Sequence, residues 1–219
     1  MYHFRGTCIL GIVLAASAMV SAGCAENAAR ADAPVAFDEI TVKRINVVGE
    51  DGKLRMILSN EDRSPNPVID GKELPRAHHQ RSAGILYFRQ NGSNVECGGA
   101  GTAKVDEATN SGVILDYGKN DGIGIGKEES DDGQSYSAKL FIADRLPPNV
   151  GIDALKAGVA TGRYEANDRI VVANTNGNAT VTLSDPKGKP RIVLGVDAAG
   201  EASFKILDKD GRVVFTAPQ

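Results

Sequence analysis

Closely spaced turn dipeptides constrain the fold of this chain more than any other feature of its sequence. Asp-Gly and Asn-Gly pairs supply the positive φ angles that tight hairpin turns require. Beyond residue 37 such pairs occur at 51–52, 70–71, 91–92, 121–122, 132–133, 176–177 and 210–211. A chain that is interrupted this often can form hairpins, but it leaves little room for long helices.

Short β-rich runs lie between these turn signals. They predict strands over residues 40–48, 54–58, 84–89, 113–117, 136–142, 170–173, 181–183, 191–196, 203–207 and 213–216. Several runs alternate, so that Ile192, Leu194 and Val196 share one strand face while Arg191 lies on the other. We therefore expect an all-β fold: an antiparallel meander of about ten or more short strands, arranged as a barrel, a roll or a sandwich with one buried face.

The last quarter of the chain is regular enough to be a repeat. Its turn glycines fall at 177, 188, 200 and 211, which gives spacings of 11, 12 and 11 residues. A related hairpin unit recurs between the two ends of the chain, because Gly52–Leu58 and Gly188–Leu194 share Gly-Lys-x-Arg followed by three aliphatic residues. Over residues 40–59 and 177–216, this pattern resembles that of bacterial secreted or lipid-anchored β-repeat proteins. The resemblance implies a fold type and no particular activity.

The first 24 residues have the layout of a secretory signal. Arg5 precedes an apolar run from Cys8 to Val20, which ends in small residues. The run is shorter than the roughly 18 apolar residues of a spanning helix. With Ala22 and Gly23 before Cys24, the segment resembles the lipobox of bacterial lipoproteins. That resemblance implies that residues 1–23 are removed and that Cys24 carries the lipid. Ordinary cleavage after Ala22, which gives a plain secreted or periplasmic protein, is the alternative.

The remaining chain divides into a tether and one domain. Residues 24–36 are small and polar, as expected of a lipid-anchored tether, and residues 37–219 are expected to form a single all-β domain. The lipobox resemblance implies a location in the cell envelope, and Ala25 after the cysteine favours the outer membrane. A net charge of −3 without a basic stripe argues against nucleic-acid binding. The expected partners are the membrane, through the lipid, and an envelope protein or glycan.

Two long polar segments interrupt the meander, and long loops are often functional. Residues 60–82 are proline-rich and contain His78 and His79, which we expect to be exposed; metal or anion binding is the alternative. Residues 146–168 contain a stretch sufficient for one or two helical turns. Cys97 begins a glycine-rich stretch, where a buried sulfur at a strand end is expected rather than a nucleophile beside a histidine.

Three further patterns have structural explanations. The acidic stretch 128–133 and the turn 208–211 lack the register of a calcium loop, so both are expected to be solvated turns. Glycine at every second position in 122–126 removes the side chains from one strand face, which permits close packing there. Arg55 and Arg191 are expected to lie along the sheet with packed stems and solvated head groups.

No catalytic, metal-binding or cofactor-binding residues are predicted, because no nucleophile elbow or nucleotide loop is present. The expected function is therefore non-catalytic binding or scaffolding by a lipid-anchored envelope protein. The alternative is an envelope hydrolase that acts on glycan or peptide through carboxylates. A groove that brings two carboxylates within about 5–9.5 Å of each other would favour the hydrolase.

Overall fold

A computed structural model describes residues 35–69, 72–75, 82–89 and 96–218. The chain divides into two units, Met1–Thr41 and Val42–Gln219. Residues 35–41 of the first unit contain neither helix nor strand, and all the secondary structure that is described below belongs to the second unit.

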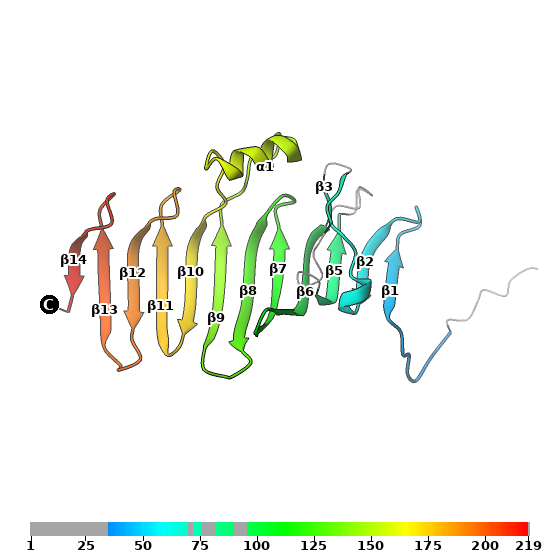
Figure 1. Cartoon of the computed structure of the whole chain (residues 1–219), viewed down its shortest axis with the longest axis horizontal. Helices are drawn as coiled ribbons and strands as arrows, with labels where there is room; N and C mark the ends of the chain where they lie inside the picture. Colours follow the sequence, from blue (N-terminus) through cyan, green and yellow to red (C-terminus); the bar gives the residue numbers. More distant parts are fainter. Residues whose placement is uncertain (1–34, 70–71, 76–81, 90–95, 219) are drawn as a thin grey trace, which may run out of the picture. The chain divides into compact units, whose positions relative to one another are not determined.

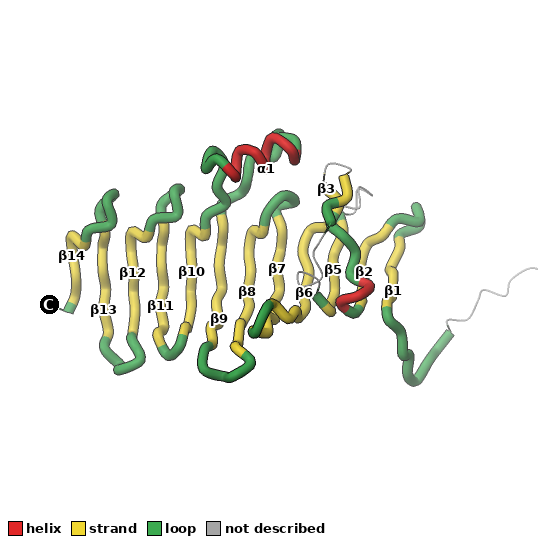
Figure 2. The backbone as a smooth tube through the Cα atoms, in the orientation of Figure 1, coloured by secondary structure: helices red, strands yellow, loops and turns green. Residues whose placement is uncertain are grey.

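The second unit is dominated by one sheet of twelve strands, in which every strand is antiparallel to its neighbours (Figure 1). The strands are β1 (Arg44–Val48), β2 (Leu54–Ser59), β5 (Ala83–Phe88), β6 (Glu96–Val105), β7 (Ala108–Asp116), β8 (Asp121–Ser130), β9 (Tyr136–Ala143), β10 (Asp168–Thr175), β11 (Asn178–Ser184), β12 (Pro190–Val196), β13 (Ala202–Leu207) and β14 (Val213–Ala217). They lie side by side in chain order, as Figure 2 shows, with β1 and β14 at the two edges.

The two long polar segments carry the remaining elements. Between β2 and β5 lie a short 3-10 helix, η1 (Glu61–Arg63), and a two-stranded hairpin of β3 (Val68–Ile69) and β4 (Lys72–Glu73). Between β9 and β10 lies the helix α1 (Ile152–Ala160). The expected short helix in residues 146–168 is therefore confirmed.

The all-β antiparallel meander predicted from the sequence is confirmed, and each predicted run overlaps a strand. The sheet differs from the expected barrel, roll or sandwich because it is open and is not closed on itself. Alternation of apolar and polar residues fixes which side chains share a face, but it does not say what covers that face. No predicted run covers β6 or β8, and the sequence analysis missed both strands because their many glycines weaken the strand signal.

The C-terminal hairpins share one turn geometry. In the turns that begin at Asp185, Asp197 and Asp208, the backbone N–H of the aspartate donates to the carbonyl four residues later, at 2.9, 3.0 and 2.9 Å. Each aspartate Oδ1 also accepts from the backbone N–H groups two and four residues along. The glycine at the fourth position of each turn has φ between 72° and 89°. The spacing of Gly188, Gly200 and Gly211 therefore reflects one recurring turn, whereas Gly177 lies in a two-residue turn between Thr175 and Asn178.

One predicted turn is wrong. Asp121 and Gly122 begin β8, and the chain reverses instead at Tyr117–Asn120, where the Tyr117 N–H donates to the Asn120 carbonyl at 3.0 Å. Gly118 supplies the positive φ of 100° there. The predicted turns at 70–71 and 91–92 lie outside the described residues.

One face of the sheet carries two continuous rows of mostly apolar side chains, and we call it the apolar face. Register pairing places in the first row Ile45, Leu58, Ile85, Ala100, Val113, Ile125, Leu140, Val172, Val181, Leu194, Phe204 and Ala217. It places in the second row Val47, Met56, Tyr87, Gly98, Leu115, Ile123, Ile142, Ile170, Leu183, Ile192, Ile206 and Phe215.

The opposite face is partly covered near the N-terminal strands, and the small cores lie there and around α1. One buried cluster joins Ile57 of β2 to Leu86 and Phe88 of β5. The other joins Ile152 and Leu155 of α1 to the preceding loop, with Leu74 packed against it. Among the described residues, no apolar side chain of β10–β14 is fully buried. The covered region of the sheet therefore lies toward its N-terminal strands.

Candidate functional site

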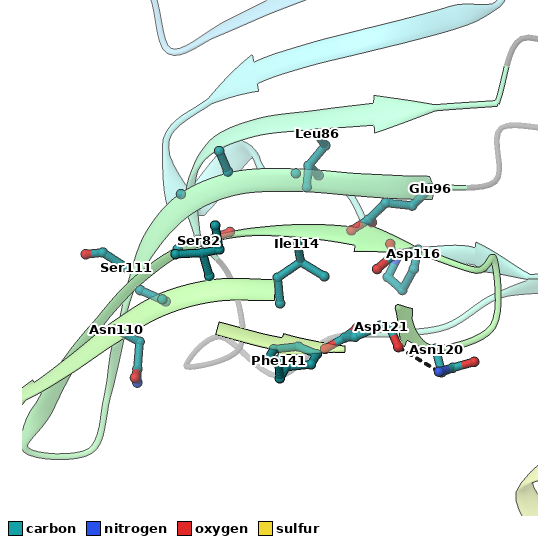
Figure 3. A pocket seen from close by; sticks show the side chains of 18 of the residues that line it. Ser82, Leu86, Glu96, Asn110, Ser111, Ile114, Asp116, Asn120, Asp121 and Phe141 are labelled. Atoms are coloured by element: carbon teal, nitrogen blue, oxygen red, sulfur yellow. Dashed lines mark hydrogen bonds between the residues drawn. The ribbon is translucent and has the colours of Figure 1, made fainter. Parts of the chain in front are cut away.

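A groove of about 550 Å³ lies on the face opposite the apolar face, over β5–β9 (Figure 3). Its floor contains a row of glycines that register pairing places side by side on four consecutive strands: Gly84, Gly101, Gly112 and Gly126. Three of these, Gly101, Gly112 and Gly126, line the groove directly. The floor is therefore backbone rather than side chain.

Close approach between strands explains why glycine is needed in this row. A Cβ added at Gly84, Gly101 or Gly112 would lie 2.0, 2.6 or 2.7 Å from a carbonyl oxygen of the neighbouring strand. Real Cβ atoms do not approach backbone so closely, so these strands could not keep this arrangement with larger residues. The same glycines that permit the close strand packing also leave the groove open.

The alternating glycines of 122–126 allow close packing, as the sequence predicted. The Phe141 ring of β9 lies against Gly124, where an added Cβ would be 2.2 Å from ring carbon Cε1. The Lys139 ammonium lies 4.9 Å from the centre of the same ring. Phe141 is only 9 % exposed. The aromatic ring that lines the groove is therefore already packed and offers no open face to a ligand.

Three carboxylate residues line one end of the groove, and Figure 3 shows them together there: Glu96, Asp116 and Asp121. Asp116 and Asp121 are paired residues on β7 and β8. The neighbouring Asn120 holds the loop at this end, because its side-chain amide donates to the Asp144 carbonyl at 2.9 Å and its Oδ1 accepts from the Leu146 N–H at 3.0 Å. Lys119, whose ammonium donates to the Val150 carbonyl, also lines the groove here. This end therefore has three carboxylates against one ammonium, and it is well braced.

The rest of the lining changes character along the strands. Leu86 and Ile114 follow the acidic end, and the glycine row comes next. Polar and charged side chains line the far end, among them Asn110, Glu128 and Ser137. Residues of the 60–82 segment, among them Val68, line the groove from outside the twelve-stranded sheet. The groove thus runs from an acidic end, through an apolar and bare centre, to a polar end.

Cys97 lies beside the acidic end of the groove but does not have the features of a nucleophile. Its side chain is half-buried and makes no disulfide. Burial raises the pKa of the Cys97 thiol, and the Asp116 carboxylate raises it further. Since the thiolate is the reactive form, this environment keeps the sulfur in its unreactive state. His78 and His79 lie outside the described residues, and so does Cys24.

Of the two acidic segments considered for calcium, 208–211 is a turn, and 128–133 comprises the end of β8 and the turn that follows it. The Asp132 carboxylate accepts from the Ser130 hydroxyl at 2.6 Å and from the Gln134 N–H at 2.9 Å, and these bonds hold its pKa below the usual value. Asp131 forms an ion pair with Lys104. In the part of the chain that the structure describes, no group of three or more His, Cys, Asp or Glu residues could hold a metal ion.

The two repeat arginines are bound rather than solvated, which corrects the sequence expectation. The Arg55 guanidinium donates to Asp51 at 2.8 Å, and the Arg191 guanidinium donates to Asp185 and to the Asp208 carbonyl. Their side chains are 25 and 26 % exposed. Each arginine therefore ties a strand to its own hairpin turn.

Sequence reasoning did not single out the groove residues Glu96, Asp116 and Asp121, because strand register brings them together over 25 positions of sequence. The glycines of 122–126 were the one local sequence feature that pointed to this region.

No known protein family matches this chain, and no characterised protein matches it. Across the described residues, no helix is both long and apolar enough to cross a bilayer.

Proposed function

We propose that this protein is a lipid-anchored protein of the cell envelope that binds an extended segment of a partner protein in the groove, without catalysis. The observation that carries this proposal is the glycine floor between an acidic end and a polar end. Lipid on Cys24 would hold the groove at a membrane surface, as the lipobox resemblance implies.

The length of the groove suits an extended peptide. Asp116 and Asn110 lie at opposite ends of one strand and are separated by six residues. At a rise of about 3.4 Å per residue, the strand between them spans about 20 Å, which is the length of roughly six extended residues. The glycine row has no side chains, so a peptide backbone can approach the sheet closely there.

The lining favours a peptide with a basic group at one end. Carboxylates at the acidic end would receive a lysine, an arginine or a terminal amine, and charge-assisted hydrogen bonds of this kind are the stronger ones. The adjacent half-buried Ile114 would receive an apolar side chain. Sugars are usually recognised by stacking on an open aromatic face, which the packed Phe141 ring does not provide, so a peptide fits better than a glycan.

Capture from the solubilised envelope tests the groove. The double variant Asp116→Asn, Asp121→Asn keeps the shape of the acidic end but removes two charges, and Glu201→Gln removes an exposed charge in the distant β12–β13 turn. We expect the wild type and Glu201→Gln to recover the same partner protein and the double variant to lose it. Equal recovery by all three proteins would show that the groove does not bind.

Membrane fractionation tests the anchor separately. Cys24→Ser should move the protein from the membrane fraction to the soluble fraction and abolish labelling by a fatty-acid probe. Unchanged fractionation and labelling would contradict lipid attachment at Cys24. This result would leave the groove proposal unaffected.

Hydrolysis is a second candidate function, since Asp116 and Asp121 are paired across neighbouring strands inside the groove. The β7–β8 register is irregular at this pair, but both residues line the groove, and glycoside hydrolases need two carboxylates in one site. Incubation with isolated envelope glycan and peptide fractions decides this question. New reducing ends or new peptide termini that disappear in Asp116→Asn would favour the hydrolase, and their absence would exclude it for those substrates.

A further inference from the structure

We infer that the apolar face is an interface through which two copies of this chain pair sheet against sheet. The face is defined by the two cross-strand rows given above, which extend over all twelve strands. The inference is independent of the groove, which lies on the other face of the same sheet.

The exposure of the apolar face is the first argument. Many of its large side chains are exposed, from 36 % for Tyr87 and Ile170 to 57 % for Ile125. At these exposures the rows present on the order of 1,000 Å² of apolar surface, whereas the largest apolar patch on a typical monomer covers roughly 300–600 Å². Each partner in a stable protein interface buries roughly 800 Å². The face is therefore large enough to form such an interface by itself.

The composition of the face is the second argument. The two rows contain no charged side chain, and the Tyr87 hydroxyl is their one polar side-chain group. Two such faces in contact would bury almost no unpaired polar group, so little desolvation would oppose their association. Because neither copy carries charge in the rows, no like charges meet when identical faces pair.

Sheet geometry shows how a second copy fits. Sheets that pack face to face lie about 10 Å apart, with their inner side chains interdigitated. Two copies related by a two-fold axis would bring the same rows together, which makes a closed pair rather than a growing filament. The second layer that the alternating sequence predicts would thus come from another molecule.

A lipid surface is less suited than a second copy of the chain to cover the apolar face. Protein surfaces that lie in a membrane interface usually combine an apolar face with lysine and arginine that attract anionic lipids. The rows lack such residues, and the chain has a net charge of −3. Charge therefore does not favour contact between this face and anionic lipid.

Two differently tagged copies of the full chain, produced in the same cells, test the pairing. Purification through one tag should recover the other. The variant Val172→Glu, Leu194→Glu places two charges in the first row at positions that are 45 and 46 % exposed, where a single copy can solvate them. We expect this variant to reduce recovery of the second tag more than 10-fold, which corresponds to about 1.4 kcal/mol.

Thr175→Glu is the matched control, because it lies on β10 as Val172 does but on the opposite face, and it is exposed. It should leave recovery unchanged. Circular dichroism and a thermal unfolding curve establish that each variant is folded. Full recovery with folded Val172→Glu, Leu194→Glu, or loss of recovery with Thr175→Glu, would overturn the inference. Failure of the wild-type copies to recover each other would also overturn it.

Discussion

The strands β5–β9 and the strands β10–β14 belong to one meander but are built differently. The first group has glycines in register, close strand contacts and a groove lined in part by the 60–82 segment. The second group consists of short hairpins, three of whose four turns share one geometry, and its strands contain no fully buried apolar side chain among the described residues. Regular hairpins extend the sheet, whereas the groove lies where the strands depart from that regularity.

Glycine has a different role in the two groups. In β5–β8 it stands inside strands because the neighbouring backbone leaves no room for a Cβ. In the C-terminal hairpins it stands in turns because the backbone has a positive φ. Gly195 of β12 continues the same cross-strand row as Gly112, yet a Cβ there would meet its nearest atom at 3.5 Å, which is an ordinary contact. The two positions therefore give a direct comparison.

Substitution of these two glycines should give the largest effect. Gly112→Ala forces a Cβ to within 2.7 Å of the Ile125 carbonyl oxygen, so we expect a loss of about 1–3 kcal/mol in the free energy of unfolding, as for other overpacked positions. Gly195→Ala should remain within about 1 kcal/mol of the wild type. Urea unfolding followed by circular dichroism measures both. Equal losses would mean that the glycine row of β5–β8 is not specially constrained.

A turn glycine should give the next largest effect. Gly211 has φ of 84° and nothing within 4 Å of an added Cβ, so backbone strain is the only cost there. Gly211→Ala should lose about 1 kcal/mol, and Gly211→Val should lose more because a β-branched residue at positive φ is a true outlier. The same urea unfolding measurement applies. A neutral Gly211→Val would show that the recurring turn tolerates another backbone conformation.

The sequence predicted the regular group well and the groove poorly. Turn glycines and alternating runs are local signals, so the C-terminal strands and the spacing of 11–12 residues could be found from the sequence. The pairing of Asp116 with Asp121 depends on register and on a turn at Tyr117–Asn120 rather than at the Asp-Gly pair that follows it. Openness of the sheet could not be predicted, because alternation is the same whether the second layer comes from this chain or from another.

Lowering the pH should have a smaller effect on the stability of the fold. Hydrogen bonds from Arg55 and from the Lys53 backbone hold the pKa of Asp51 below its usual value. The pKa of Asp185 is also lowered, because bonds from Lys189 and Arg191 outweigh the desolvation by burial. A carboxyl whose pKa is lower in the folded state stabilises the fold above its unfolded pKa of about 3.9, and this contribution is lost as pH falls through the folded pKa.

Urea midpoints measured between pH 7 and pH 3 should therefore stay level down to about pH 4 and then fall. Asp185→Asn removes one of these carboxyls and should make the fall shallower, whereas Glu201→Gln should not. An Asp185→Asn profile with the same acid dependence as the wild type would mean that this turn does not contribute to the fall.

The histidines should give the smallest effect. Exposed-loop substitutions usually change stability by less than about 0.5 kcal/mol, and we expect this of His78→Ala and His79→Ala. Urea unfolding of the two histidine variants is compared with that of Gly211→Val, whose loss in the free energy of unfolding sets the scale. A loss as large as that of Gly211→Val would indicate that the 60–82 segment uses these side chains in a core or a binding site.

Site-specific photo-crosslinking tests most directly the claim that binding belongs to the irregular group of strands and not to the repeats. A photoreactive phenylalanine analogue replaces Ser137, which lines the groove on β9, or Ser203, which lies on the same sheet face on β13. After irradiation of intact envelope, we expect a discrete adduct with a partner protein from position 137 and none from position 203. An adduct from position 203 alone, or equal adducts from both positions, would contradict the account.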